Sequence, residues 1–486
     1  MAVRPKYTKQ VAEFVAHTSL EAIPAAMIWT TKRVILDTIG NAIGGYSTNG
    51  ARRALDAVTR LGGHPDSTTL VTGHKTSPAQ AVFANAMLAT TLSADDSCLL
   101  LGHHGQSSVF PALALTEQRD LTGADFLAAT ALAYEASARI ASAARHIVRR
   151  KDGSLVSNPS GGGENWISFA AAFSAGRAAR LGSEAMANAM GLAGFTASIP
   201  TAARWNRPAF NNMKVHPYAF TAQNGTMAVL LTESGFTGDG AILDADVGQN
   251  CADWWTMAGI LASDPESAFA GMGEDWITLQ TAFKPYPSCR FLQGPISLLT
   301  QIMKEEGVGP DRIERVDVYT DGFIRHYHMD SPVVECEEDC QFSMPHVLAM
   351  AALGVTPGPD WVQPSFWHDP IVESFKDRVR CHVMQSATDT NVAQLLEGRW
   401  ERYPHKIVVT GSDFVFERSG DYIIGDAFVP ETRLDDGSLF AKFRNFVSGQ
   451  LSGTQAERCI DIIMTLDEQK DVRELIACLH SGSQLA

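Results

Sequence analysis

Small and apolar residues recur at three- and four-residue spacing over more than half of the chain, from Thr8 to about Glu274. Stretches such as 112–115 and 170–175 consist mostly of alanine with leucine or phenylalanine. Such a stripe buries one face of each helix, and alanine lets neighbouring helices approach closely. Helix-start residues precede several of these stretches, for example Thr122. The pattern predicts an all-helical domain with closely packed interfaces.

The pattern changes after Tyr286, where three segments alternate apolar and polar residues with a period of two. These segments are rich in β-branched residues, which favours strands. Helical segments lie between them. Residues from about 279 to 430 are therefore predicted to form a smaller α+β domain. The expected strands are 313–319, 378–383 and 406–410, and the expected helices are 294–304 and 343–353.

The end of the chain returns to the helical pattern, at 439–447, 455–466 and 472–479. We expect these C-terminal helices to rejoin the first helical domain. The predicted fold class is mainly α with an α+β second domain. The predicted division is 1–278 for the first part of the helical domain, 279–430 for the α+β domain and 431–486 for the C-terminal helices.

The composition describes a globular chain with an acidic balance. Of its 486 residues, 45% are hydrophobic and 19% are charged, which is enough apolar material for a large core. A formal net charge of −15 without a lysine or arginine block disfavours nucleic acid and acidic membranes as partners. No apolar run reaches the length of about 18 residues that a membrane span needs. The N-terminus lacks the apolar region of a signal peptide, so we expect a cytoplasmic location.

Cysteines and histidines give little sign of a metal or a disulfide framework. The eight cysteines are scattered, which suits a reducing compartment. Cys336 and Cys340, with His326, His328 and His346 close by, could be drawn as a zinc site, but a second cysteine pair is lacking. The glycine patterns of nucleotide-binding loops are also lacking. We expect neither a structural metal nor a cofactor.

The segment 283–290, FKPYPSCR, is the strongest single candidate for a binding site. Each proline fixes its own φ near about −65° and biases the residue before it toward extended geometry. Lys284, Tyr286 and Arg290 would therefore project from a stiff connector. Cations held in this way can bind an anion, and Arg290 can grip a carboxylate with two parallel hydrogen bonds. Tyr286 can equally be a packing residue.

Short motifs along nearly the whole chain resemble those of the MmgE/PrpD family. The stretch 35–45, ILDTIGNAIGG, is similar to the family's N-terminal signature. The resemblance implies a large helical domain made from both ends of the chain, an inserted lid domain and a cleft where they meet. It also implies a homodimer. Further similar stretches follow in the family's order at 95–96 with 102–112, 213–217 with 222–225, 283–290, 342–345, 369–372 and 441–444.

Asp95 and Asp96 follow an alanine-rich helix and precede His103 and His104 in a glycine-flanked loop. Burial can tune carboxylates and imidazoles toward neutral pH, so this loop can carry general acid–base catalysis. The resemblance places the family's catalytic carboxylate and histidine here. Counting back from Pro111 assigns that histidine to His104 and leaves His103 as a neighbour that contacts the substrate. The alternatives are an aspartate that only caps the turn and a histidine that is a satisfied core residue.

Lys214 lies in a polar turn ahead of a helix that begins near Phe220. A lysine here can bind a substrate carboxylate or stabilise an enolate-like transition state. It matches the active-site lysine of the resembled family, and a solvated lysine at a helix start is the alternative. Lys284, Tyr286 and Arg290 would complete an anion-binding rim from the lid side.

Three positions depart from the family's pattern. Where its dehydratases and decarboxylases carry an aspartate and two histidines, this chain has Ser93, Asn158 and Gln293. Asparagine and glutamine orient a substrate by hydrogen bonds but do not exchange protons near pH 7. We therefore expect Asn158 and Gln293 to bind substrate, and the substrate or the reaction to differ from the usual ones.

The sequence leaves three functions open. The first is a cofactor-independent lyase or isomerase that removes a proton next to a carboxylate, as the resemblance to enzymes of 2-methylcitrate dehydration, cis-aconitate decarboxylation and iminodisuccinate epimerisation implies. The second is a catalytically silent binding or scaffold protein, which the three substitutions favour. The third is a serine hydrolase built on Ser107 or Ser108, which lacks the final glycine of a nucleophile elbow.

Overall fold

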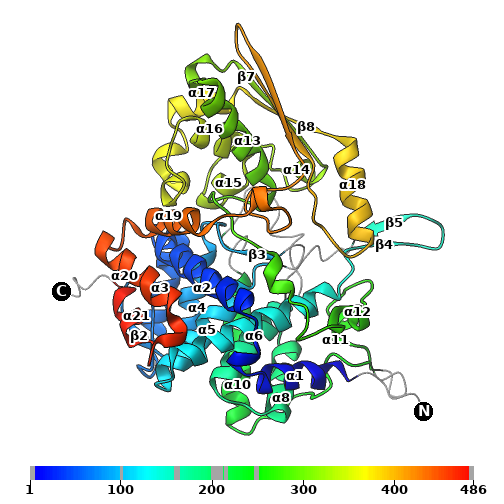
Figure 1. Cartoon of the computed structure of the whole chain (residues 1–486), viewed down its shortest axis with the longest axis vertical. Coiled ribbons are helices and arrows are strands. Elements are labelled where there is room, and N and C mark those ends of the chain that lie inside the picture. Colours follow the sequence, from blue (N-terminus) through cyan, green and yellow to red (C-terminus); the bar gives the residue numbers. More distant parts are fainter. Residues whose placement is uncertain are drawn as a thin grey trace.

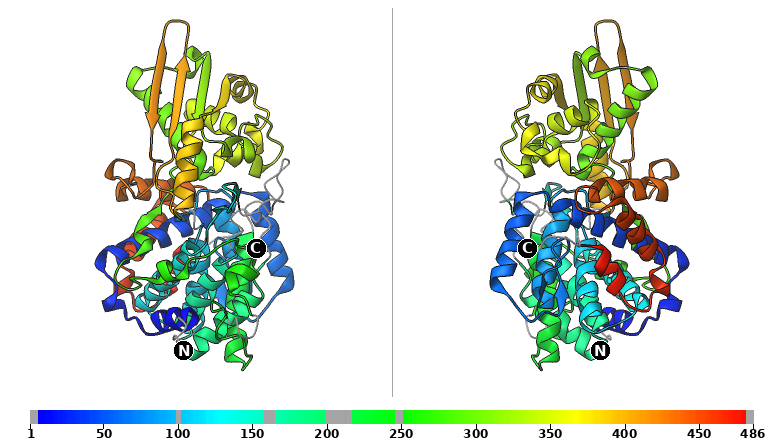
Figure 2. Two further views of the ribbon diagram at one scale, coloured as in Figure 1. Left: turned by 90° about the vertical axis from the view of Figure 1, so that its right-hand side faces the viewer. Right: turned by 90° about the vertical axis from the view of Figure 1, so that its left-hand side faces the viewer.

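The computed structural model describes residues 6–98, 102–157, 165–198, 212, 217–245 and 251–480. A helical body forms one end of the molecule and a domain with a β-sheet forms the other (Figures 1 and 2). This architecture confirms the predicted fold class, mainly α with an α+β second domain. Within these ranges, no helix combines the length and the apolar character needed to cross a membrane.

The helical body is built around long helices that are buried on nearly every side. In α6 (Gly123–Ser142), Thr122 and Asp125 form a capping box, and the alanine-rich sequence that follows is buried almost throughout. Such a helix needs neighbours all round it, and α5 and α7 are two of them. The other bounds are α1 (Tyr7–His17), α2 (Ala25–Gly45), α3 (Asn49–Leu61), α4 (Pro78–Thr90), α5 (Gly105–Gln118), α7 (Ile167–Ala178), α8 (Ser183–Phe195), α10 (Pro217–Glu233), α11 (Trp254–Met257) and α12 (Pro265–Phe269).

The C-terminal helices share one apolar core with the N-terminal helices. Phe443, Cys459 and Leu475 are buried in the same cluster as Leu36 and Ile39 of α2. Both α19 and α20 pack against α2, and the C-terminal helices lie beside the blue N-terminal ones in Figure 1. The bounds are α19 (Asp436–Val447), α20 (Gly453–Met464) and α21 (Arg473–Cys478).

Glycines in α2 allow unusually close helix contacts. A Cβ at Gly45 would lie 1.9 Å from the main-chain oxygen of Leu88 in α4, and a Cβ at Gly44 would lie 2.9 Å from the main-chain oxygen of Phe446 in α19. Larger residues would push these helices apart. The glycine-rich end of α2 therefore brings α4, with the loop that follows it, close to the C-terminal helix α19.

Short antiparallel strand pairs tie loops together in the helical body. In the β3–β6 pair, Ser97 is opposite Ala282 and Cys98 is opposite Thr281. This pair joins the loop after α4 to the segment that leads into the second domain. The bounds are β1 (Ser67–Thr68) with β2 (Lys75–Thr76), β3 (Ser97–Cys98) with β6 (Thr281–Ala282), and β4 (Ile147–Arg149) with β5 (Leu155–Ser157).

The second domain contains a four-stranded sheet in the order β10-β9-β7-β8. Strands β7 and β8 run parallel, whereas β9 runs antiparallel to β7 and β10. The three predicted strands are confirmed as β7, β8 and β9. Strand β10 was not predicted, because this edge strand is exposed or half-exposed along its length and carries charged residues. The bounds are β7 (Arg315–Thr320), β8 (Val379–Val383), β9 (His405–Thr410) and β10 (Val415–Gly420).

Helices complete the core of the second domain. The two predicted helices are confirmed as α13 and α16, which pack against each other and against the sheet. Their apolar residues form a cluster separate from the core of the helical body. The bounds are α13 (Arg290–Glu306), α14 (Phe323–His326), α15 (Glu337–Phe342), α16 (Met344–Ala352), α17 (Pro370–Lys376) and α18 (Gln385–Leu396).

Candidate active site

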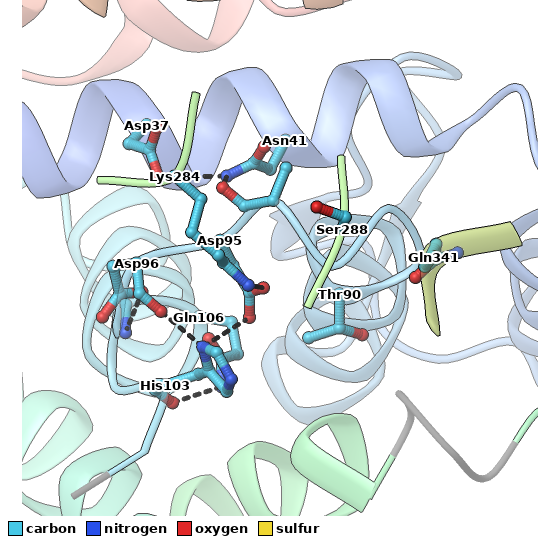
Figure 3. Close-up of polar contacts among 12 residues, drawn as sticks. Asp37, Asn41, Thr90, Asp95, Asp96, His103, Gln106, Lys284, Ser288 and Gln341 are labelled. Atoms are coloured by element: carbon cyan, nitrogen blue, oxygen red, sulfur yellow. Dashed lines mark hydrogen bonds and ion pairs between the residues drawn. The ribbon is translucent and has the colours of Figure 1, made fainter. Parts of the chain in front are cut away.

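The loop between α4 and α5 carries Asp95 and Asp96 to the junction of the two domains. Ser93 has a left-handed backbone with φ of 49°, and Gly102 has φ of 102°, so the chain turns sharply on both sides of the aspartates. The β3–β6 pair fixes this loop against the segment that carries Lys284. Figure 3 shows the polar side chains that gather around Asp95.

Asp96 anchors the N-terminus of α5. Its Oδ1 accepts a hydrogen bond from the main-chain N–H of Gly105 at 3.0 Å. Its Oδ2 accepts from the main-chain N–H of His104 at 3.2 Å and from the hydroxyl of Tyr134 at 2.6 Å. A Cβ at position 105 would lie 2.3 Å from Asp96 Oδ1, so the close approach requires glycine. Both carboxylate oxygens of Asp96 are thus used to hold the loop.

The environment of Asp96 favours its neutral form. Burial raises the pKa of Asp96 to about 6, with a further contribution from the negative charge of Asp95. The hydrogen bond from Tyr134 and the nearby His103 act in the opposite direction. Asp96 therefore changes charge close to neutral pH.

Asp95 lies between two basic groups. Lys284 Nζ donates to Asp95 Oδ1 at 3.2 Å, and His103 Nδ1 lies 3.4 Å from Asp95 Oδ2. Asp95 and Lys284 are only 3% and 2% exposed, whereas 21% of the His103 side chain is exposed. A buried ion pair is costly to desolvate, so its presence next to an imidazole points to a purpose other than stability. A carboxylate in contact with both an ammonium and an imidazole can hold and transfer a proton.

The two neighbouring histidines face different surroundings. His103 faces Asp95, as described above, and its Nδ1 also forms a hydrogen bond with the main-chain oxygen of Asp96. His104 is fully buried, and its Nδ1 lies 2.7 Å from the hydroxyl of Ser137 while its ring lies 5.2 Å from the ring of Tyr134. The sequence assigned the acid–base role to His104 and a binding role to His103. His104 immediately precedes α5 and its ring packs against α6, whereas His103 lies beside Asp95.

Of the three side chains expected to bind an anion from segment 283–290, Lys284 reaches Asp95. Tyr286 instead stacks on Trp361 of the second domain, with ring centroids 5.7 Å apart. Gln293 is fully buried, and its Nε2 donates to the main-chain oxygens of Tyr286 at 2.9 Å and Ser288 at 3.0 Å. Its Oε1 accepts from the main-chain N–H of Tyr286 at 3.2 Å. Tyr286 is therefore a packing residue here, and Gln293 holds the proline-containing turn in shape.

Arg290 forms the two-pronged contact expected of it, but with a residue of the same chain. Its Nε and Nη2 donate to Asp426 Oδ1 and Oδ2 at 3.2 and 2.8 Å. Asp426 is fully buried and Arg290 is 8% exposed. The guanidinium edge predicted to grip a substrate carboxylate is thus occupied by an internal one, which ties α13 to the segment after β10.

A second buried ion pair lies behind the aspartate loop. Lys442 Nζ of α19 donates to Asp37 Oδ1 at 2.6 Å and to the main-chain oxygen of Ala94 at 2.6 Å. Asn41 Nδ2 donates to Asp37 Oδ2 at 3.1 Å and to the same Ala94 oxygen at 3.2 Å. Burial lowers the pKa of Lys442 and raises that of Asp37, and each partner opposes the effect on the other. Sequence reasoning used these residues only as parts of family motifs, because nothing local shows that positions 405 residues apart meet.

Several other predicted features can be placed. Lys214 and Asn158 lie outside the described residues. Ser107 and Ser108 are fully buried at the start of α5, where neither forms a nucleophile elbow. In the part of the chain that the structure describes, no group of three or more His, Cys, Asp or Glu side chains could hold a metal ion. The thiol of Cys340 instead donates a hydrogen bond to the main-chain oxygen of Cys336, with Sγ 3.6 Å from that oxygen.

The fold and this loop define a two-domain, mainly helical protein with an acid–base cluster at the domain junction. A model of the MmgE/PrpD N-terminal domain matches residues 9–252, and one of the MmgE/PrpD C-terminal domain matches residues 286–468. The chain therefore belongs to the MmgE/PrpD family. It is also similar to the cis-aconitate decarboxylase-like protein oryM of Aspergillus oryzae, with 24% identity over 316 residues. That match covers 63% of this chain and 62% of oryM, which is less than two thirds of the relative's length.

Proposed function

We propose that this protein is a lyase or isomerase that removes a proton next to a carboxylate of a small carboxylic acid, without a cofactor. The observation that carries the proposal is the contact of buried Asp95 with both Lys284 and His103. Membership of the MmgE/PrpD family and the name of the oryM relative support a role of the dehydratase or decarboxylase kind.

Asp95 is our candidate for the base. Its two oxygens contact two basic side chains, whereas those of Asp96 accept from the main chain of the loop and from the Tyr134 hydroxyl. A substrate carboxylate that binds Lys284 would take over part of its charge and leave Asp95 a stronger base. The same ammonium would stabilise the negative charge that develops on the substrate carboxylate when the proton leaves.

His103 is our candidate for the acid. In a dehydration, Asp95 takes the proton from carbon, and the electron pair left there forms a double bond as the neighbouring C–O bond breaks. His103 then protonates the departing oxygen, which leaves as water. In an epimerisation the proton returns to the other face of the carbon, and in a decarboxylation the C–C bond to CO2 breaks and the carbon takes a proton. Lys214, which matches the family's active-site lysine, is a further proposed member of the site.

A second candidate is a protein that binds the carboxylic acid without turning it over. Gln293 stands where the family's enzymes carry a histidine. Its amide is bonded to main-chain oxygens of the proline-containing turn that precedes α13. The side chain at this position therefore neither exchanges a proton with the substrate nor offers it an amide group for hydrogen bonding. Lys284 would still bind an anion in such a protein.

Proton NMR in D2O separates these candidates. The purified protein is incubated with 2-methylcitrate, citrate, cis-aconitate and iminodisuccinate, and deuterium uptake and turnover are followed. We expect exchange by the wild type and a loss of about 10²- to 10⁴-fold in Asp95→Asn, the usual contribution of a general base. Exchange that survives intact in Asp95→Asn would contradict the assignment of the base, and ligand binding without exchange by the wild type would favour the binding protein.

Two further variants make the loss interpretable. Asp95→Asn leaves Lys284 buried without its partner, which destabilises a protein. The double variant Asp95→Asn/Lys284→Met removes both charges, so it should regain thermal stability without regaining exchange. Lys376→Met is the matched control for the loss of a buried lysine, because Lys376 is 2% exposed and donates to Glu373 at 2.6 Å. It lies on α17 of the second domain, so its replacement should leave the exchange rate unchanged.

A further inference from the structure

We propose that Lys442 is a positioning residue for the aspartate loop: by holding the main-chain oxygen of Ala94, it fixes the direction of the Asp95 carboxylate. This inference rests on the proposed function of Asp95. It assigns a role at the active site to α19, near the C-terminal end of the chain, whereas the predicted site residues come from the first three hundred residues.

The contacts of Lys442 converge on a single point of the loop. Ala94 immediately precedes Asp95, and its oxygen accepts from Lys442 Nζ at 2.6 Å and from Asn41 Nδ2 at 3.2 Å. Lys442 is 7% exposed, and its ammonium also lies 5.2 Å from the centre of the Phe446 ring. A buried ammonium with a carboxylate and a carbonyl oxygen as acceptors has little freedom to move. It can therefore hold the carbonyl in one place.

The loop needs such a restraint because its backbone is strained. Ser93 has φ of 49°, which a residue with a side chain adopts only when its surroundings hold it there. The next residue is Ala94, whose main-chain oxygen lies in the peptide that links it to Asp95. Two donors on this oxygen, one from α2 and one from α19, hold the turn in the form that points Asp95 toward Lys284. Without them the turn can relax and the carboxylate can move away.

The charged side chains around the aspartate loop form two ion pairs whose charges cancel. Asp37 and Lys442 form one ion pair, and Asp95 and Lys284 form the other. The two pairs influence each other, since Asp95 and Lys284 both act on the pKa of Lys442. Removal of Lys442 alone therefore leaves one uncompensated negative charge in the cluster. Removal of Asp37 and Lys442 together keeps the balance but still releases the Ala94 oxygen from the ammonium.

The test compares Lys442→Met with the matched control Lys32→Met. Lys32 lies on α2, is 6% exposed and donates to the main-chain oxygen of Met464 at 2.9 Å as well as to Asp467. It thus joins α2 to the C-terminal helices with the same chemistry but does not touch the aspartate loop. We expect Lys442→Met to lower kcat about 10²-fold with little change in KM, since a small misplacement of a reacting group has that effect. Lys32→Met should leave both constants within about threefold of wild type.

The double variant Asp37→Asn/Lys442→Met excludes a general loss of stability as the cause. It should melt close to the wild-type temperature, because no unpaired charge remains buried, yet keep the low kcat. Equal losses of kcat in Lys442→Met and Lys32→Met, or recovery of kcat in the double variant, would show that Lys442 is only structural.

A second readout does not depend on turnover. The ¹³C-histidine NMR signal of His103, assigned with His103→Asn, reports on the contacts of that ring with Asp95 and with the main-chain oxygen of Asp96 in the aspartate loop. It should shift in Lys442→Met and in the double variant and stay in place in Lys32→Met. If the wild type exchanges no compound of the panel, the proposed function fails, but this signal still decides the matter. An unchanged His103 signal in Lys442→Met would overturn the positioning role.

Discussion

Replacing Asp96 by asparagine should change how the stability of the protein depends on pH. Burial and the neighbouring Asp95 raise the pKa of Asp96 from 3.8 to about 6 in the folded protein. The folded protein binds this proton more tightly than the unfolded chain does, so protonated Asp96 stabilises the fold. The full stabilisation is present below the unfolded pKa. It is lost as the pH rises from about 4 to about 6, through the folded pKa. Asparagine does not titrate, so the variant should lack this loss.

The size of the effect follows from the two pKa values. Each pKa unit corresponds to about 1.4 kcal/mol, so the full loss is about 3 kcal/mol. About 0.5 kcal/mol of it is already lost at pH 4, and the rest is lost by about pH 7. The variant should be less stable than wild type at low pH, because the amide nitrogen of asparagine cannot accept a hydrogen bond, so some of the three donors lose their acceptor. Relative to wild type, its free energy of unfolding should then rise by about 2.5 kcal/mol between about pH 4 and pH 7.

Equilibrium urea unfolding followed by tryptophan fluorescence measures this difference. The control is Asp435→Asn, because Asp435 also caps a helix but is exposed, and the N–H of Ser438, 2.7 Å away, lowers its pKa. Ionised Asp435 stabilises the wild type above its unfolded pKa, and this stabilisation is lost as the pH falls through the folded pKa. The difference in unfolding free energy between wild type and Asp435→Asn should therefore depend on pH in the opposite direction. A difference between wild type and Asp96→Asn that is flat, or that falls with rising pH, would refute the reasoning about Asp96.

Three further outcomes are expected. Gly105→Ala should destabilise the protein by about 1–3 kcal/mol in urea unfolding, because the added Cβ would collide with Asp96. Gly453→Ala is the control, since a Cβ at that position meets open space, and it should have little effect. Equal losses of stability in the two variants would contradict the close packing at Gly105. Arg290→Met should cost about 3–5 kcal/mol because Asp426 is left buried alone, and Arg290→Met/Asp426→Leu should recover most of it; a single variant as stable as wild type would remove the structural role. A fluorophosphonate probe should not label the fully buried Ser107, and a labelled peptide found by mass spectrometry would revive the hydrolase.

The fold was predictable where a local pattern decides the structure. The alanine-rich stripes allow only helices that pack closely, and α6 follows its capping signal at Thr122. The β-branched alternation in the second domain likewise gave strands β7, β8 and β9. Strand β10 has no such pattern because only its pairing with β9 makes it a strand. Two-residue strands such as β3 and β6 are too short to leave any periodic signal.

The site was predictable in its residue types but not in its pairings. The aspartate loop and Lys284 were expected from the sequence, and they meet in the structure. Which of His103 and His104 faces Asp95 depends on the direction of the chain after Gly102, and counting from a motif does not reveal that direction. The partner of Arg290 is Asp426, 136 residues away, and no local signal marks this long-range contact.

The most direct test of the proposed acid–base site compares His103→Asn with His104→Asn in the deuterium-exchange assay. Asparagine can keep a hydrogen bond at either position, and far-UV circular dichroism is the control that checks the folding of both variants. We expect His103→Asn to lose about 10²-fold or more of the exchange rate, the contribution of a general acid, while His104→Asn stays within about tenfold of wild type. A loss in His104→Asn that equals or exceeds the loss in His103→Asn would contradict the proposed site.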